Sequence, residues 1–148
     1  MKILFLGDVV GKSGCLAVTE NLPDLIKKKK IDFEIINGEN ADDQGVGITE
    51  KISNDLFNSG ADVITTGNHV WDQKEIINYI DKEKRLLRPE NLNHPSPGKG
   101  FEIFDSKNGF KIGVLNLMGN IFMKKCDDVF DSAKKFMQKN NLKKNYDF

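Results

Sequence analysis

The chain has 148 residues, of which 39% are hydrophobic and 30% are charged, which is typical of one globular domain with a sizeable core. Its 22 basic and 22 acidic residues give a net charge of zero, which excludes the basic surplus that bulk nucleic-acid binding needs. No apolar run reaches the roughly 20 residues of a membrane span. The two cysteines, Cys15 and Cys126, form no C-x-x-C motif. We therefore expect a cytoplasmic protein with reduced thiols and no membrane partner.

The first half of the chain alternates short apolar runs with helical patterns. Residues 2–7, 32–38 and 61–67 are apolar runs of strand length. A helical pattern leads to the lysines at 27–30, and Thr49 is placed to cap a helix that ends before Gly60. This order of strands and helices predicts a parallel sheet with right-handed crossovers.

The next segments carry different signals. Asp72 and Glu75 have the spacing of a capping box, which predicts a helix from there to Ile80. Residues 88–100 hold three of the four prolines and are expected to form a loop. Asn108-Gly109 lies between two apolar runs and predicts a β-hairpin. We expect a helix over residues 129–138, and we expect residues 145–148 to begin a further strand.

Polar side chains follow each of the three predicted parallel strands. Asp8 follows Gly7, Glu39 and Asn40 follow Gly38, and Asn68 and His69 follow Gly67. Ligands of open parallel sheets bind outside the carboxyl ends of the strands, and glycine lets the backbone bend sharply there. The three clusters are therefore expected to meet at one edge of the sheet.

The residue types at this edge favour a metal site. Aspartate, glutamate and asparagine offer hard oxygen donors and histidine adds an imidazole, a mixture that suits manganese, iron, magnesium or zinc. Two such ions about 3.5–4 Å apart can clamp a phosphoryl group. Each cluster alone is typical of a turn or of a structural histidine. Their coincidence at one edge favours an active site.

A second interpretation is a phosphate-binding loop at residues 7–13, "GDVVGKS". The P-loop motif requires four residues between its first glycine and Gly-Lys-Ser, and this loop is one residue short. Asp8 would also place a negative charge among groups meant for phosphate. This interpretation predicts binding of ATP or GTP that does not depend on Glu39 or Asn68.

The segments "LFLGDVVG", "INGENA", "GITEKI", "GADVITTGNHVWD", "LLRPEN" and "PGKG" occur in this order along the chain. In order and spacing they resemble a bacterial family of calcineurin-like metallophosphoesterases, the 2′,3′-cyclic-nucleotide 2′-phosphodiesterase branch. The resemblance extends over essentially the whole chain. It implies a hydrolase acting on small phosphodiesters such as 2′,3′-cyclic nucleotides.

The resemblance also implies a fold and a site. The fold is α/β, part of a four-layer α/β/β/α sandwich, and the implied cofactor is a pair of metal ions, iron or manganese. Asp8, Glu39, Asn40 and Asn68 are the implied metal ligands, with Glu39 as the bridge. His69 is the implied catalytic residue, which protonates the leaving oxygen or stabilises its charge.

Two departures from the family pattern bear on these expectations. Cys15 stands where the family usually has an arginine, a group that would help to hold the site or an oligomer contact. The segments that supply further metal-binding histidines in the family are not found in this chain, whose histidines are His69 and His94. We expect His94 to be a surface residue of the proline-rich loop. The chain is therefore interpreted as an incomplete domain over residues 1–148, truncated at its C-terminus.

Three points stay open at the level of sequence. The chain is either an active hydrolase or a non-catalytic half-domain that binds a nucleotide or a partner. Arg88 is a candidate for contact with the substrate phosphate, and the alternative is a surface arginine before a proline turn. The pattern is compatible with a homo-oligomer and selects no oligomeric state.

Overall fold

A computed structural model describes residues 1–92, 95–123, 125–140 and 143–148. In chain order the first elements are β1 (Ile3–Leu6), α1 (Gly11–Lys29), β2 (Phe33–Asn37), α2 (Glu50–Ser59), β3 (Val63–Thr65), α3 (Ile76–Ile80) and β4 (Leu86–Leu87). The later elements are β5 (Phe101–Asp105), β6 (Lys111–Leu115) and α4 (Val129–Lys139). His94 and its expected surface position lie outside the described residues. No helix in the described ranges is long and apolar enough to cross a membrane.

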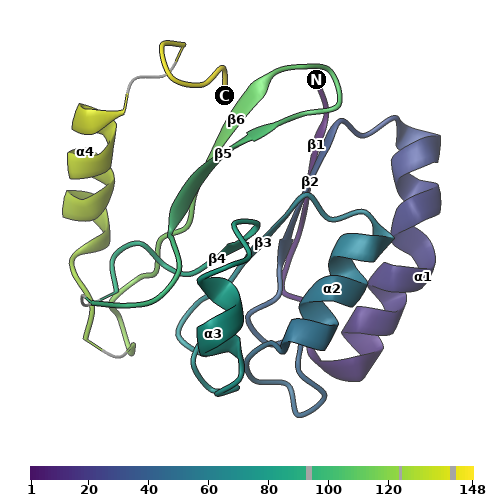
Figure 1. The fold of residues 1–148 in the computed structure, drawn as a ribbon, viewed down its shortest axis with the longest axis horizontal. Coiled ribbons are helices and arrows are strands. Elements are labelled where there is room, and N and C mark those ends of the chain that lie inside the picture. Colours follow the sequence, from purple (N-terminus) through teal and green to yellow (C-terminus); the bar gives the residue numbers. More distant parts are fainter. Residues whose placement is uncertain (93–94, 124, 141–142) are drawn as a thin grey trace.

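The elements form four layers (Figure 1). A parallel sheet of four strands in the order β1-β2-β3-β4 carries α1, α2 and α3 on one face. The antiparallel hairpin of β5 and β6 lies on the other face, and α4 lies beyond the hairpin. This α/β/β/α order confirms the expected fold class.

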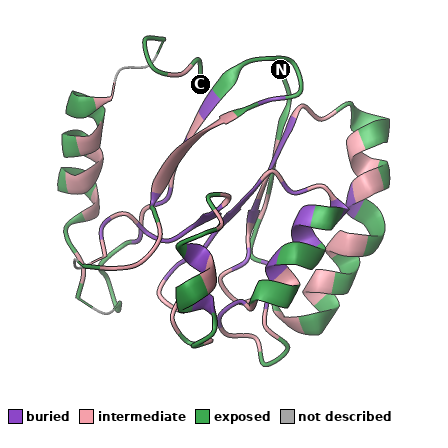
Figure 2. Cartoon of the chain, in the orientation of Figure 1, coloured by how far each residue is buried: buried purple, intermediate pink, exposed green. Residues whose placement is uncertain are grey.

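Two apolar clusters hold α1, α2, α3, the parallel sheet and the hairpin together, and Figure 2 shows buried positions along the parallel strands and on the helices that cover them. Leu22 of α1 and Leu56 of α2 belong to the cluster between the helices and the parallel sheet. Phe33, Val63 and Ile112 belong to the second cluster, which lies between the parallel sheet and the hairpin. β3 is buried at every residue, and β2 is buried except at Ile35 and Asn37, as expected near the centre of a parallel sheet.

Local signals explain where several elements begin and end. The Thr49 hydroxyl accepts a hydrogen bond from the Ile52 amide, and Gly60 ends α2 in a left-handed conformation with φ of 119°. The hairpin turns at Gly109 with φ of 78°. Phe148 lies beside β6, because its carbonyl accepts a hydrogen bond from the Gly113 amide at 2.8 Å.

The predicted capping box at Asp72 and Glu75 does not form. The helix begins only at Ile76, and Glu75 makes no capping hydrogen bond. Glu75 instead accepts from the Glu50 amide at 3.3 Å, and Asp72 lies 2.6 Å from the ring of His69. Other partners therefore take both side chains that the cap would need: His69, which is local, for Asp72, and the distant Glu50 amide for Glu75.

Candidate active site

The carboxyl ends of β1, β2 and β3 lie at one edge of the parallel sheet (Figure 1). Backbone hydrogen bonds join the three loops that follow these strands. Val9 donates to the Asn37 carbonyl at 3.0 Å, Gly11 donates to the Asn40 carbonyl at 2.8 Å, and Gly38 donates to the Thr65 carbonyl at 2.9 Å. The expected convergence of polar side chains therefore rests on a shared backbone framework.

Asp8 and Asn40 meet directly at this edge. The Asn40 side-chain amide donates to Oδ2 of Asp8 at 2.6 Å, although 32 residues separate the two. Asp8 is exposed and Asn40 is half-buried. The carboxylate thus stays open to solvent while one of its oxygens is oriented by the neighbouring loop.

Glu39 reaches from the end of β2 across the end of β3. Its carboxylate lies against Gly67, where an added Cβ would overlap with both carboxylate oxygens. Its Oε1 accepts from the His69 amide at 3.4 Å. Close contact rather than an unusual backbone angle therefore favours glycine at position 67, because an added Cβ would displace the Glu39 carboxylate from the end of β3.

His69 is oriented by Asp72. The distance from Nδ1 of His69 to Oδ2 of Asp72 is 2.6 Å, and the two side chains are 35% and 34% exposed. An ionised carboxylate only accepts hydrogen bonds, so Nδ1 carries the proton in this pair. The opposite ring nitrogen, Nε2, is left for a ligand. The capping-box pattern assigns Asp72 to the start of a helix, although its spacing of three residues from His69 is also a usable signal.

The donors at this edge suit a hard metal ion. Asp8 and Glu39 supply carboxylates, and Asn40 and Asn68 supply amide oxygens, which are the donor types that manganese, magnesium and iron accept. Over the described ranges, no group of three or more histidine, cysteine, aspartate or glutamate side chains is placed to hold a metal. The donor types present are thus compatible with a hard metal ion held by a mixed set of carboxylates and amides, and joint metal binding by Asp8, Glu39, Asn40 and Asn68 stays a prediction.

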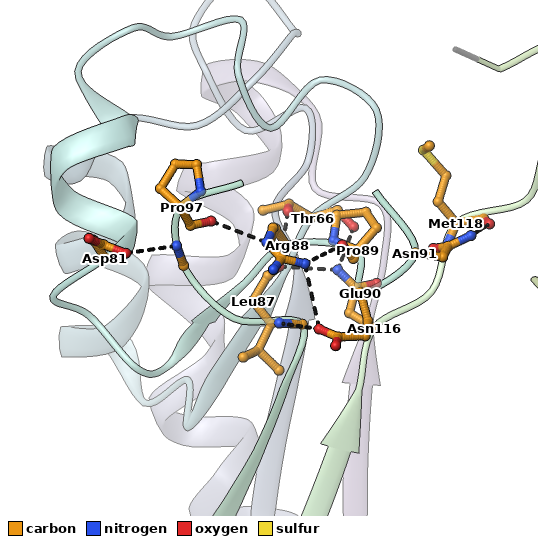
Figure 3. A network of polar contacts seen from close by, with 12 residues as sticks. Thr66, Asp81, Leu87, Arg88, Pro89, Glu90, Asn91, Pro97, Asn116 and Met118 are labelled. Carbon is orange, nitrogen blue, oxygen red and sulfur yellow. Dashed lines mark hydrogen bonds and ion pairs between the residues drawn. The ribbon is translucent and has the colours of Figure 1, made fainter. Parts of the chain in front are cut away.

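Arg88 follows β4 at the same edge of the sheet but is buried, with 4% of its surface exposed. Its Nη1 donates to the Pro89 carbonyl at 2.8 Å and its Nε donates to the Pro97 carbonyl at 3.1 Å (Figure 3). Glu90 lies 3.5 Å from Nη1. The alternative of a surface arginine is therefore wrong, and its contact with a substrate phosphate stays a prediction.

Asn116 is a residue of this region that the sequence analysis did not find. Its side-chain amide donates to the carbonyl of Thr66 at 2.8 Å and to that of Leu87 at 3.1 Å (Figure 3). It thereby ties the end of β6 to the ends of β3 and β4. A single asparagine after a predicted strand carries no sequence signal for such a role.

Cys15 lies in α1 beside the loop that follows β2. Its thiol donates to the Ala41 carbonyl at 3.2 Å, and burial raises the pKa of this thiol, with a further contribution from the negative charge of Asp43. The thiol is therefore held in its neutral form and helps to attach α1 to the loop that carries Asn40.

Comparisons with known proteins show which family the chain resembles in sequence and fold. The chain is 50% identical over 133 residues to the 2′,3′-cyclic-nucleotide 2′-phosphodiesterase of Bacillus subtilis (strain 168), an alignment covering 90% of this chain and 50% of that protein. A crystal structure of a hypothetical protein from Thermus thermophilus superposes with a TM-score of 0.87 and 35% identity, covering 95% of this chain and 54% of the other.

A crystal structure described as a novel phosphatase from Mycoplasma pneumoniae superposes with a TM-score of 0.86 and 34% identity, covering 95% of this chain and 52% of the other. The chain thus spans about half the length of the relatives it matches. A family model described as YmdB-like protein matches residues 4–148. The chain belongs to the YmdB-like protein family.

Proposed function

We propose that this chain carries metal-binding and catalytic residues of a phosphodiesterase that hydrolyses small phosphodiesters. The observation that carries the proposal is the meeting of three strand ends, where the Asn40 amide donates to Asp8 at 2.6 Å and Glu39 lies against Gly67, the residue before Asn68. The relative from Bacillus subtilis, at 50% identity, is named for hydrolysis of 2′,3′-cyclic nucleotides. We therefore propose this substrate class.

The proposed metal ligands are Asp8, Glu39, Asn40 and Asn68. Bound iron or manganese would supply an activated water and neutralise the charge on the phosphoryl oxygens. Asp8 is held by the Asn40 amide, and Glu39 is held between Gly67 and the His69 amide. These contacts orient the carboxylates before any ligand arrives, so that little side-chain freedom is lost on binding.

His69 is proposed to act on the leaving oxygen. Asp72 holds Nδ1 at 2.6 Å, so Nε2 is the atom that faces a bound phosphodiester. In the imidazolium form both ring nitrogens carry hydrogen, and transfer of the Nε2 proton to the departing oxygen leaves neutral His69 with its hydrogen on Nδ1. This transfer would prevent the build-up of charge on the leaving oxygen, and such proton transfer contributes about 10²–10⁴-fold to enzymatic rates. Neither Asp72 nor His69 is proposed to bind a metal ion.

The first experiment is the metal content of the purified chain after loading with manganese or iron, measured by elemental analysis beside hydrolysis of a 2′,3′-cyclic nucleotide. Asn68→Ala is expected to lose bound metal and activity together. Asn58→Ala is the matched control, because Asn58 is an exposed asparagine of α2. A chain whose metal content and activity survive Asn68→Ala would contradict the proposed ligand set.

His69→Ala separates the catalytic role from metal binding. We expect this variant to keep its metal and to lose turnover by about 10²–10⁴-fold. Loss of metal from His69→Ala would contradict the proposed division of roles. A native chain that binds no metal would instead favour the second function considered above, a non-catalytic half-domain that binds a nucleotide or a partner.

A further inference from the structure

The turn that follows β2 is held by a side chain. Asn37 is the last residue of β2, and its Oδ1 accepts a hydrogen bond from the Glu39 amide at 3.1 Å. This contact between an asparagine side chain and the amide two residues later is an Asx turn, which asparagine forms more readily than most residues. The direction in which Glu39 leaves the strand therefore depends on the side chain of Asn37.

The other amides of this turn donate to backbone acceptors. The Gly38 amide donates to the Thr65 carbonyl at 2.9 Å, and the Ala41 amide donates to the Gly38 carbonyl at 3.2 Å. Core side chains also confine the turn, because a Cβ added at Gly38 would lie 3.0 Å from two of them. A substitution at Asn37 would thus remove the hydrogen bond of the Glu39 amide and leave the backbone hydrogen bonds of the turn in place.

Asn37 also borders the loop that carries Asp8. A Cβ added at Gly7 would lie 3.2 Å from the Cβ of Asn37, and the Asn37 carbonyl accepts from the Val9 amide at 3.0 Å. Asn37 therefore lies between the strand ends that carry the two candidate carboxylates, Asp8 and Glu39.

The side chain of Glu39 turns the direction of this backbone into the position of its carboxylate. The carboxylate lies against Gly67, and its Oε1 accepts from the His69 amide at 3.4 Å. We propose that Asn37 is a positioning residue, whose side-chain oxygen directs the Glu39 carboxylate to the end of β3. Asn37 acts through Glu39 rather than on a ligand, and its effect on metal binding rests on the function proposed above.

Two substitutions separate the acceptor from the rest of the side chain. Asn37→Leu keeps a side chain of similar size but has no hydrogen-bond acceptor, and most of the side chains around position 37 between the sheets are apolar. Asn37→Asp keeps the acceptor and the shape. Asn37→Ala serves in place of the leucine variant if that variant does not fold.

The first measurement needs no metal. Amide hydrogen exchange is followed by NMR on the whole 148-residue chain. In Asn37→Leu the Glu39 amide is expected to exchange about tenfold faster, because it loses its acceptor, while the amides of Gly38 and Ala41 keep their rates. Asn37→Asp is expected to restore slow exchange at Glu39. Unchanged exchange at Glu39, or an equal increase at all three amides, would overturn the proposal.

The amide resonance of His69 reports where the Glu39 carboxylate lies. We expect this resonance to shift in Asn37→Leu and in Glu39→Ala, because both changes take the carboxylate away from the His69 amide. Adding Asn37→Leu to Glu39→Ala is expected to shift it no further, since Asn37 acts through Glu39. No shift in Asn37→Leu, or a further shift in the double variant, would contradict the positioning role.

A titration with manganese separates this inference from the proposed function. Asn37→Leu is expected to bind manganese about 10- to 100-fold more weakly than the native chain. Asn58→Leu is the matched control, because Asn58 is exposed on α2, and it is expected to bind like the native chain. Native affinity in Asn37→Leu would overturn the proposal. A native chain that binds no manganese would refute the proposed function, and the exchange rates and the His69 resonance would then decide the positioning role by themselves.

Discussion

A buried glutamate makes the stability of this chain depend on pH. Glu34 of β2 is fully buried, and its carboxylate accepts two hydrogen bonds from Nζ of Lys107, at 2.8 and 3.0 Å. Burial and the adjacent Asp62 carboxyl raise the pKa of Glu34 from 4.5 to about 7, although Lys107 lowers it. The folded state therefore holds this proton more tightly than the unfolded chain does.

The raised pKa fixes the direction and size of the effect. The stabilising contribution of Glu34 is fully present below pH 4.5 and is lost as the pH rises through about 7. A difference of about 2.5 in pKa corresponds to about 3 kcal/mol of unfolding free energy. Most of this contribution, on the order of 2.5 kcal/mol, is expected to disappear between about pH 5 and pH 8.

Urea unfolding of the native chain and of Glu34→Gln at pH 5 and pH 8 measures this contribution. Other groups titrate in both proteins, so the relevant quantity is the difference between their pH dependences. The native chain is expected to lose about 2.5 kcal/mol more than Glu34→Gln over this interval. Equal losses in the two proteins would refute the reasoning. Lys107→Met supplies a second check, because removal of the lysine raises the pKa of Glu34 further and extends the loss to higher pH.

Three further predictions concern single side chains. Gly67→Ala is expected to displace the Glu39 carboxylate and to lower metal affinity by about 10- to 100-fold, as measured by titration with manganese, while circular dichroism stays unchanged. Asp72→Asn is expected to reduce kcat about tenfold or more with little change in KM, because the ring of His69 loses its orienting acceptor; an unchanged kcat would contradict this role. Thr49→Ala is expected to cost about 1 kcal/mol in urea unfolding, because the amide of Ile52 loses its cap.

Much of the fold could be predicted because the deciding signals are local. Thr49 and Gly60 mark the two ends of α2 as expected, and Asn108-Gly109 predicts the hairpin between β5 and β6. Buried parallel strands appear in the sequence as apolar runs, and the alternation of strands and helices is compatible with only a few sheet topologies. The same reasoning brought Asp8, Glu39, Asn40 and Asn68 to one edge, because parallel strands end on the same side of a sheet.

Other features depend on partners that are distant along the chain. β4 consists of Leu86–Leu87. This strand is too short to show an alternation of apolar and polar residues, so the sequence does not predict it. Lys107 contacts Glu34 across 73 residues, and the Asn116 amide contacts the Thr66 carbonyl across 50 residues.

Asp72 shows most clearly the difference between what local sequence predicts and what the tertiary structure decides. By itself the sequence determined which strand ends carry the candidate site residues, because apolar periodicity and turn residues act locally. Asp72 has a possible partner three residues away on either side, and only the tertiary structure decided that it serves His69 rather than a helix end. A side chain hydrogen-bonds with whichever donor the fold brings within about 3 Å, and a local spacing rule does not contain that information.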